Sequence, residues 1–404
     1  MTICRVCAGP LQEFADFGRH PLSDAFRRPE DDSEEFFFRL AVGSCASCTM
    51  VQLVEEVPRE LMFHEGYPYY SSGSAFMRAH FEAAARGFLD RAGPDGFIVE
   101  LGCNDGAMLH VVAEAGGRHL GIEPSGAVAA VAASRGVRVV GEFFDEDLAA
   151  GIRACDGPAD VIFAANTLCH IPYVNSVLKG VSTLLAPDGI FVFEDPYFAD
   201  ILAKSSFDQI YDEHFYFFTA GSVANLAARH GLELVAAERL PVHGGEVRYT
   251  LMRAGAGLPS ASVTDLLAAE AVYGVTEEAT LKQFQSTVER IRTDLTGLLS
   301  LLRDKGKTVA GYGATAKSAT VTNFCGIGPD LVSYVCDTTP AKQGRLTPGV
   351  HLPVRPHSAF AESYPDYALL FAWNHATEIM AKEQEFTRSG GRWITYVPEV
   401  TITP

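Results

Sequence analysis

The amino-acid sequence predicts an α/β protein of three parts: a small cysteine-bearing N-terminal module, a central parallel sheet with helices, and a second α/β unit at the C-terminus. Two Cys-x-x-Cys pairs fall within the first 48 residues, and strand-like and helix-like segments alternate between residues 97 and 194. A second strand, glycine turn and helix start follow at 307–317. Strands that alternate with crossover helices form parallel sheets. The 404 residues suit two or three domains, which we place at 1–74, 75–255 and 256–404.

The composition is that of a packed globular protein, with 48% hydrophobic and 20% charged residues. A formal net charge of -18 opposes binding to nucleic acid. No apolar run approaches the ~20 residues that cross a bilayer, and the N-terminus lacks the basic and apolar regions of a secretory signal. We therefore expect a cytoplasmic protein with no nucleic-acid or membrane partner. An anionic small substrate would need a local cluster of basic residues.

The N-terminal module carries Cys4 and Cys7, then Cys45 and Cys48. Each pair has the spacing that lets two thiolates face one ion, and together they complete a tetrahedral four-sulfur shell for zinc. With all four positions filled by thiolate, this zinc is expected to be structural. A disulfide or a thioredoxin-type redox motif is the alternative, but no βαβ context surrounds the pairs.

The central part reads as a parallel sheet that ends in an antiparallel hairpin. The expected strands are 97–101, 119–123, 137–140, 161–165 and 190–194, the expected helices are 105–115, one capped by Ser125, and 174–185, and the hairpin is 232–238 with 247–252. In such a sheet a ligand binds at the carboxyl ends of the strands.

A glycine-containing turn follows the first of these strands and includes Glu100, Gly102, Asn104 and Gly106. Its glycines let the backbone approach a ligand, and the carboxylate can accept a hydrogen bond from it. The spacing is not a dinucleotide fingerprint, because that pattern needs a glycine where Asn104 stands. It resembles motif I of class I S-adenosylmethionine (SAM)-dependent methyltransferases, in which the loop wraps the amino-acid part of the cofactor.

Two further residues are expected at the cofactor. Glu123 ends the second strand and is placed to accept from both ribose hydroxyls, although a solvated strand end is the alternative. Asn166 follows a later strand and is expected at the floor of the site. The hairpin at the end of the sheet is also how class I methyltransferases finish.

An ionisable cluster, Tyr211, Glu213 and His214, lies among aromatic residues, and His170 follows a sheet strand. A histidine in such surroundings is more often a hydrogen-bonded core residue than a base. The two histidines nevertheless fall where active sites of α/β sheets collect, which favours a catalytic role.

The C-terminal turn, with Gly311, Gly313 and Ala316, formally satisfies a dinucleotide fingerprint, and Asp337 ends the next expected strand, 331–336. A long helical stretch, 262–305, precedes it. The alternative function is therefore an NAD(P)-dependent nucleotide-sugar oxidoreductase that uses this loop.

Taken together, the motifs resemble the sugar C-methyltransferases, which make C-3 branched deoxysugars on thymidine-diphosphate (dTDP) carriers for antibiotic biosynthesis. The resemblance spans essentially the whole chain. It rests on the cysteine pairs, Tyr67-Pro-Tyr69-Tyr-Ser-Ser72, the segment from Asn166 to Pro172, Tyr211-Asp-Glu-His214-Phe, Pro241-Val-His-Gly-Gly245 and Tyr312-Gly-Ala-Thr-Ala-Lys317. It implies a class I methyltransferase sheet of Rossmann-like topology and a second Rossmann-like domain that helps bind the nucleotide-sugar without a nicotinamide.

The resemblance also implies a mechanism. The 4-keto group acidifies the C-3 hydrogen, His214 removes it, and the resulting enolate attacks the SAM methyl group. Glu213 would orient His214 or tune its basicity, and Tyr211 and His170 would donate to the enolate oxygen. Tyr69 would line the sugar pocket, with Tyr67 and Tyr70 as the alternatives.

The remaining substrate contacts are expected at Tyr70 and at the residues Gly244, Gly245, Arg248, Tyr312 and Lys317. Lys317, near a helix N-terminus, and Arg248 are candidates for the diphosphate. The chain departs from the family twice, with Ser318-Ala319 where Gly-Asn is common and Glu246-Val247 where Ser-Leu is common. The sequence leaves the oligomeric state open, a monomer included.

Overall fold

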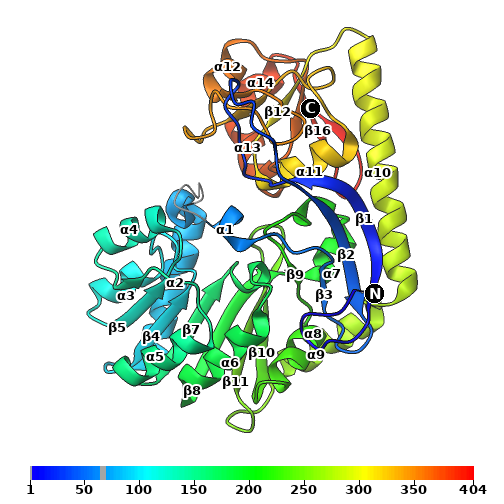
Figure 1. Cartoon of the computed structure of the whole chain (residues 1–404). Helices are drawn as coiled ribbons and strands as arrows, with labels where there is room; N and C mark the ends of the chain where they lie inside the picture. Colours follow the sequence, from blue (N-terminus) through cyan, green and yellow to red (C-terminus); the bar gives the residue numbers. More distant parts are fainter. Residues whose placement is uncertain (1, 64–69) are drawn as a thin grey trace.

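The computed structural model (Figure 1) describes residues 2–63 and 70–404, and its strands form three sheets. The orders are β1-β2-β3-β9, β10-β11-β8-β7-β4-β5-β6 and β14-β13-β12-β15-β16-β17. The expected three-part α/β architecture is confirmed. None of the helices in the described ranges is long and apolar enough to cross a membrane.

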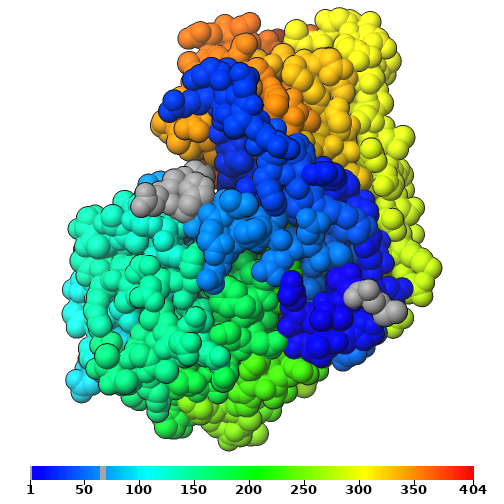
Figure 2. Space-filling model, viewed as in Figure 1, coloured from blue at the N-terminus to red at the C-terminus, as the bar shows by residue number. Residues whose placement is uncertain are grey.

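The N-terminal sheet is antiparallel and consists of β1 (Leu11–Pro21), β2 (Phe37–Cys45), β3 (Val51–Leu53) and β9 (Tyr216–Phe217). Its last strand comes from the middle of the chain. The β1–β2 ribbon extends to the C-terminal domain, where Phe17 packs edge-on against Phe324 with ring centroids 5.1 Å apart. Figure 2 shows these N-terminal residues, in blue, spread over both the central and the C-terminal parts.

The central sheet is parallel except at its end, where β11 runs antiparallel to both β8 and β10, as the expected hairpin requires. Its strands are β4 (Phe97–Leu101), β5 (Arg118–Ile122), β6 (Val139–Val140), β7 (Ala159–Ala165), β8 (Leu185–Pro196), β10 (Leu232–Leu240) and β11 (Glu246–Arg253). Its helices are α2 (Ala75–Ala92), α3 (Leu109–Glu114), α4 (Gly126–Ser134), α5 (Glu146–Asp156) and α6 (Val174–Leu184).

Two local expectations in this sheet differ from the structure. Helix α3 begins at Leu109 and not at residue 105, because the chain first turns through Gly106 at φ +77°. Ser125 does stand at the N-cap position of α4, but its side chain makes no capping hydrogen bond. Its backbone N–H instead donates to Glu123 Oε1, so the residue serves the carboxylate next to it.

The excursion between β8 and β10 holds α7 (Phe198–Lys204), the 3-10 turn η3 (Phe207–Gln209), β9 and α8 (Ala220–Ala228). Before the central sheet come α1 (Arg59–Met62) and the 3-10 turn η1 (Ser71–Gly73), and η2 (Leu168–His170) follows β7. In Figure 1, α1, α7 and β9 lie toward the carboxyl ends of the parallel strands, whereas α8 lies beside α9.

The C-terminal sheet is parallel except for β17. The expected helical stretch is two helices, because Gly274 adopts φ +69° and ends the first of them. The expected strand 331–336 is confined to Val335–Asp337. The elements are α9 (Ala261–Tyr273), α10 (Glu278–Asp304), β12 (Val309–Tyr312), α11 (Ala316–Cys325), β13 (Val335–Asp337), β14 (Val354–Pro356), α12 (His357–Glu362), β15 (Tyr367–Leu370), η4 (Trp373–His375), α13 (Ala376–Lys382), α14 (Gln384–Arg388), β16 (Arg392–Thr395) and β17 (Thr401–Thr403).

Candidate active site

The four cysteines of the N-terminal module converge on one point. Their sulfur atoms all lie within 4.8 Å of one another, with Cys4 and Cys48 3.5 Å apart and Cys7 and Cys45 3.4 Å apart. Four Zn–S bonds of ~2.3 Å in a tetrahedron place the sulfurs about 3.8 Å apart, so the donor set fits zinc. All four ligand positions are thiolates, which makes the site structural.

The glycine turn after β4 has the left-handed backbone that its glycines permit. Gly102, Asn104 and Gly106 have φ of +66°, +49° and +77°. A side chain at Gly102 would collide with Thr167, and one at Gly106 would press on Ala132 at 3.0 Å. The glycines are therefore required by the turn and by internal packing, in addition to any approach of a ligand.

Two buried carboxylates line this turn. Glu123 accepts from the backbone N–H of Asn104 at 3.0 Å and of Ser125 at 2.8 Å, and burial raises its pKa. Each of its oxygens keeps a second lone pair for a ribose hydroxyl. Glu100 Oε2 has no hydrogen-bond partner within the described residues, and burial, then Asp105, holds the pKa of Glu100 well above its usual range. An orphaned acceptor of this kind fits the ammonium of the SAM amino-acid part.

The sequence analysis missed residues that surround this turn. Asp105 is fully buried, accepts from Ser72 Oγ and pairs with Arg135 at 3.2 Å. On the other side, His80 of α2 meets Glu194 at 2.6 Å. Asp105 stands inside the motif and could have been found there. His80 had no such signal, because 114 residues separate it from its partner.

Arg248, an expected diphosphate contact, is engaged within the sheet. Its guanidinium pairs with Glu194 at 2.6 Å and with Glu238 at 3.2 Å. This internal pairing neutralises the charge of Arg248. The residue was expected to contact the diphosphate of a ligand, and in the structure it contacts carboxylates of the protein. Asn166 does stand at the end of β7, with φ +47° and its N–H donating to the Glu194 carbonyl at 2.7 Å.

His214 is buried and held at both ring nitrogens. Nδ1 lies 2.8 Å from the carbonyl oxygen of Gln209, which can only accept, so Nδ1 carries the proton. Nε2 is therefore the lone-pair nitrogen, and it accepts from the Tyr211 hydroxyl at 2.7 Å. Burial, then the neighbouring His170, holds the pKa of His214 well below its usual range. At neutral pH this imidazole is an uncharged base.

The surroundings of His214 include the other expected catalytic residues. The His170 ring stacks on it at 5.3 Å between centroids, and burial lowers the pKa of His170 to about 4. Glu213 is also buried. The hydrogen bond that orients the His214 ring, however, runs from Nδ1 to the Gln209 carbonyl, a contact that the sequence did not predict. Tyr69 lies outside the described residues.

The segment that carries His214 is held from both outer domains. Asp208 accepts from Trp373 Nε1 and from the Tyr396 hydroxyl, each at 2.6 Å, and both donors belong to the C-terminal domain. Thr320 of α11 donates to the Ile210 carbonyl at 2.8 Å. From the N-terminal module, Ser23 N–H donates to Asp212 at 3.1 Å, and β3 pairs with β9.

Of the expected contacts in the C-terminal domain, Lys317 reaches the loop between β10 and β11, whereas Tyr312 points into the core of its own domain. The Lys317 ammonium lies 3.5 Å from the His243 carbonyl and 5.3 Å from the centroid of the Trp373 ring. The Tyr312 hydroxyl donates to Glu383 at 2.8 Å, and its ring packs against Trp393 in the domain core. The sugar contact expected of Tyr312 stays a prediction, and its hydroxyl already has a partner inside the domain.

Gly244 and Gly245 form the β10–β11 turn, with φ of +99° and +123°. A side chain at Gly245 would overlap Asp200, and one at Gly244 would come within 3.0 Å of Trp373. Gly244 thus lets the turn pack closely against Trp373 of the C-terminal domain, and Gly245 lets it pack closely against α7. Tyr70, the other expected substrate contact, precedes η1 and is 43% exposed.

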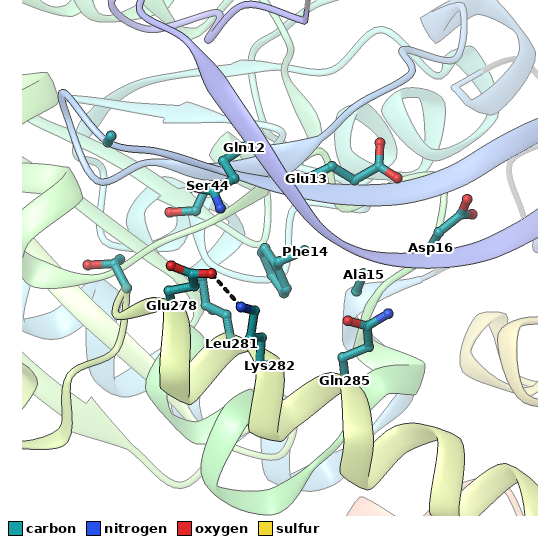
Figure 3. Close-up of a pocket in the computed structure, with 12 residues that line it drawn as sticks. Gln12, Glu13, Phe14, Ala15, Asp16, Ser44, Glu278, Leu281, Lys282 and Gln285 are labelled. Carbon is teal, nitrogen blue, oxygen red and sulfur yellow. Dashed lines mark ion pairs between the residues drawn. The ribbon is translucent and has the colours of Figure 1, made fainter.

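A groove elsewhere, of about 260 Å³, lies between β1 and the start of α10 (Figure 3). Its polar side chains, such as Glu13 and Gln285, are exposed to solvent, and Lys282 pairs with Glu278. None of its lining residues appears among the buried polar groups that lack a partner in the described ranges. The chemistry therefore points to the cleft at the carboxyl ends of the strands.

A cofactor turn with an orphaned acidic acceptor, a neutral buried imidazole and a four-thiolate zinc module together define a SAM-dependent methyltransferase. Family models agree: a methyltransferase domain matches residues 77–237, a zinc binding domain matches 4–63, and a C-methyltransferase C-terminal domain matches 241–398. C-methyltransferase NovU of Streptomyces niveus is 36% identical over 99% of this chain and 96% of its own. The chain belongs to the C-methyltransferase family, with SAM as methyl donor and zinc in its N-terminal domain.

Solved structures resemble only part of the chain. Magnesium protoporphyrin IX methyltransferase ChlM of Synechocystis PCC 6803, with bound SAM, is 10% identical over 44% of this chain and 79% of its own, with a TM-score of 0.34. The CcbJ methyltransferase of Streptomyces caelestis is 16% identical over 43% of this chain and 89% of its own, also at 0.34.

Proposed function

We propose that this C-methyltransferase transfers the SAM methyl group to C-3 of a dTDP-4-keto-deoxysugar. The observation that carries the proposal is the pair of hydrogen bonds at the His214 ring. Its Nδ1 lies 2.8 Å from the Gln209 carbonyl, which makes Nε2 the nitrogen with a free lone pair, and burial holds the pKa of the ring well below its usual range. A neutral imidazole is suited to removing a carbon acid's proton, and a positioned general base contributes roughly 10²–10⁴-fold.

The proposed reaction begins when His214 Nε2 takes the C-3 proton, and the C–H electron pair moves into an enolate that ends on the 4-keto oxygen. SAM supplies an electrophilic methyl group, so that a C–C bond forms as the S–CH₃ bond breaks and its electrons return to sulfur. Tyr211 and His170 stand within reach of His214 and are assigned to donate to the enolate oxygen, a contribution of roughly 10²–10³-fold per donor. Glu213 is assigned to tune the base, and Tyr69 to line the sugar pocket.

Lys317 is assigned to the diphosphate, because its ammonium reaches the loop between β10 and β11, where it contacts the His243 carbonyl and the Trp373 ring and makes no ion pair with any described residue. Burial lowers its pKa, and the nearby carboxylates of Asp208 and Glu246 oppose that shift. A bound diphosphate would add negative charge and favour the protonated ammonium.

The test is transfer of labelled methyl from SAM to a panel of dTDP-4-keto-deoxysugars, read by mass spectrometry, with His214→Asn assayed beside the parent. The variant is expected to lose solvent exchange of the C-3 hydrogen by at least 100-fold while still binding SAM. Normal exchange in that variant would refute His214 as the base.

The oxidoreductase alternative is tested in the same sample by absorbance at 340 nm. Reduction of the keto-sugar by NAD(P)H without methyl transfer would favour it. The match of residues 241–398 to a C-methyltransferase C-terminal domain supports methyl transfer over that alternative.

A further inference from the structure

A thiol and two imidazoles converge at a point outside the zinc module. The Cys169 sulfur and one nitrogen each of His170 and His214 all lie within 4.8 Å of one another. Among the described residues, the cysteine cluster of the N-terminal module is the other group of this kind. The proposed chemistry uses both histidines but gives the thiol no role. Cysteine and histidine side chains are the preferred ligands of zinc in proteins.

Two segments of the chain hold these three residues together. Cys169 and His170 belong to η2, which follows β7, and His214 lies just before β9. The hydroxyl of Tyr216, in β9, donates to the Pro172 carbonyl at 2.8 Å and joins the two segments. The His170 and His214 rings stack with centroids 5.3 Å apart. The donor atoms are therefore positioned by the fold itself.

Both rings offer a lone pair to an ion. His170 Nε2 is buried and has no hydrogen-bond partner among the described residues. A neutral imidazole has one nitrogen with a lone pair, and in His214 this nitrogen is Nε2, because Nδ1 donates to the Gln209 carbonyl. A buried nitrogen without a partner costs stability, which coordination of an ion would recover.

The charges around the sulfur favour a cation. Three buried carboxylates act electrostatically on the Cys169 thiol, namely those of Asp195, Glu213 and Glu246. The Lys317 ammonium, which acts on His214, supplies a single positive charge. A divalent cation at this point would stabilise the ionised carboxylates, and a thiol that coordinates such an ion loses its proton.

We propose that Cys169, His170 and His214 form a second zinc site, whose occupancy blocks proton removal by taking the lone pair of His214 Nε2. Zn–S bonds of ~2.3 Å and Zn–N bonds of ~2.0 Å in a tetrahedron place the donor atoms about 3.5 Å apart, so small side-chain rotations complete the shell. The ion replaces the Tyr211 hydroxyl at Nε2, and the Cys169 proton goes to solvent. The metal site stands on this geometry, whereas the block on catalysis rests on the proposed function.

The first experiment counts zinc in the full-length chain. Protein that holds one equivalent is equilibrated with increasing free Zn²⁺, and the bound zinc is measured by elemental analysis. The parent is expected to take up a second equivalent, and Cys169→Ser should bind it at least tenfold more weakly. Cys325→Ser is the matched control, because Cys325 is also buried but lies in α11, outside both clusters. Its affinity should stay within twofold of the parent.

Two results of that experiment would overturn the site: no second equivalent in the parent, or a second equivalent that Cys169→Ser binds as tightly. A spectrum gives an independent readout. Co²⁺ added to protein with its structural zinc in place should produce a thiolate-to-cobalt charge-transfer band in the parent and in Cys325→Ser. The same band in Cys169→Ser would also overturn the site.

Tyr211→Phe tests which nitrogen of His214 is used. The Tyr211 hydroxyl competes with the ion for Nε2, so its removal should tighten binding of the second zinc about 2- to 10-fold, the value of one hydrogen bond. An affinity that stays unchanged or falls would overturn coordination through Nε2.

The effect on catalysis is measured as C-3 hydrogen exchange over the same range of free zinc. The parent and Cys325→Ser should lose exchange as the second equivalent binds, whereas Cys169→Ser should need at least tenfold more zinc for the same loss. SAM affinity should change less than twofold. A second zinc that leaves exchange intact would overturn the block on the base. No exchange at any zinc concentration, in protein that binds SAM, would instead overturn the proposed function, while the zinc counts still decide the metal site.

Discussion

Replacing Tyr211 by phenylalanine tests the His214 base through its pKa. The Tyr211 hydroxyl donates to Nε2, the nitrogen that a proton must occupy, and therefore stabilises the neutral imidazole. A net hydrogen bond of 0.5–1.5 kcal/mol corresponds to about 0.4 to 1.1 pKa units at 1.36 kcal/mol per unit. Tyr211→Phe should therefore raise the pKa of His214 by that amount, because the charged form no longer has to displace the donor.

The assay is the pH dependence of C-3 hydrogen exchange under kcat/KM conditions, which reports groups of the free enzyme. Since the base acts when neutral, activity falls as the pH drops through its pKa, and the acidic limb should move upward in Tyr211→Phe. The loss of an enolate donor would lower the whole curve without moving that limb. Tyr216→Phe is the control, because its hydroxyl donates to the Pro172 carbonyl and not to His214. An acidic limb unmoved in Tyr211→Phe would refute our assignment of the base.

Four further predictions follow from the contacts described. Removal of zinc, checked by elemental analysis, should cut C-3 exchange at least tenfold but change the SAM dissociation constant less than threefold, because β9 pairs with the zinc module and the cofactor turn does not. Glu123→Ala should weaken SAM binding about 10- to 100-fold, as measured by calorimetry, because it removes hydrogen bonds to a charged group. Thr320→Val should lower the free energy of unfolding by about 1–3 kcal/mol in denaturant titrations, because it leaves the buried Ile210 carbonyl without its donor. Asp195→Asn should gain stability relative to the parent as the pH rises from 5.5 to 8, since burial raises the pKa of Asp195 to about 8 and its ionisation weakens the native state over that range.

Much of this fold can be predicted from short stretches of the sequence. Cysteine spacing predicts the zinc cluster, and alternating strands and helices predict the central sheet, because both depend on neighbours a few residues apart. The short β9 strand could not be predicted. It has two residues, Tyr216 and Phe217, and its partner strand β3 lies far upstream in the chain.

Side-chain roles that depend on distant partners were harder to predict. The motif around Tyr312 suggested a sugar contact, but the hydroxyl meets Glu383, 71 residues later, inside the domain. The sequence predicts Arg248 as a diphosphate contact, but it does not reveal that the guanidinium pairs with Glu194. The partner of His214 Nδ1 is a backbone carbonyl. Because every residue has a backbone carbonyl, the residue type does not predict this contact.

The position of His214, the proposed base, depends on all three domains, whereas the cofactor turn is built by the central sheet. Asp208, near one end of the catalytic segment, is fixed by Trp373 and Tyr396 of the C-terminal domain. Asp212, near the other end, is fixed by Ser23 of the N-terminal module. Gln209 lies between these anchors and His214 follows the second one, and the Gln209 carbonyl and the His214 imidazole are 2.8 Å apart. Under the proposed mechanism the zinc module and the C-terminal domain therefore act on the same chemical step, proton removal by His214, and a disturbance in either should separate methyl-donor binding from carbanion formation.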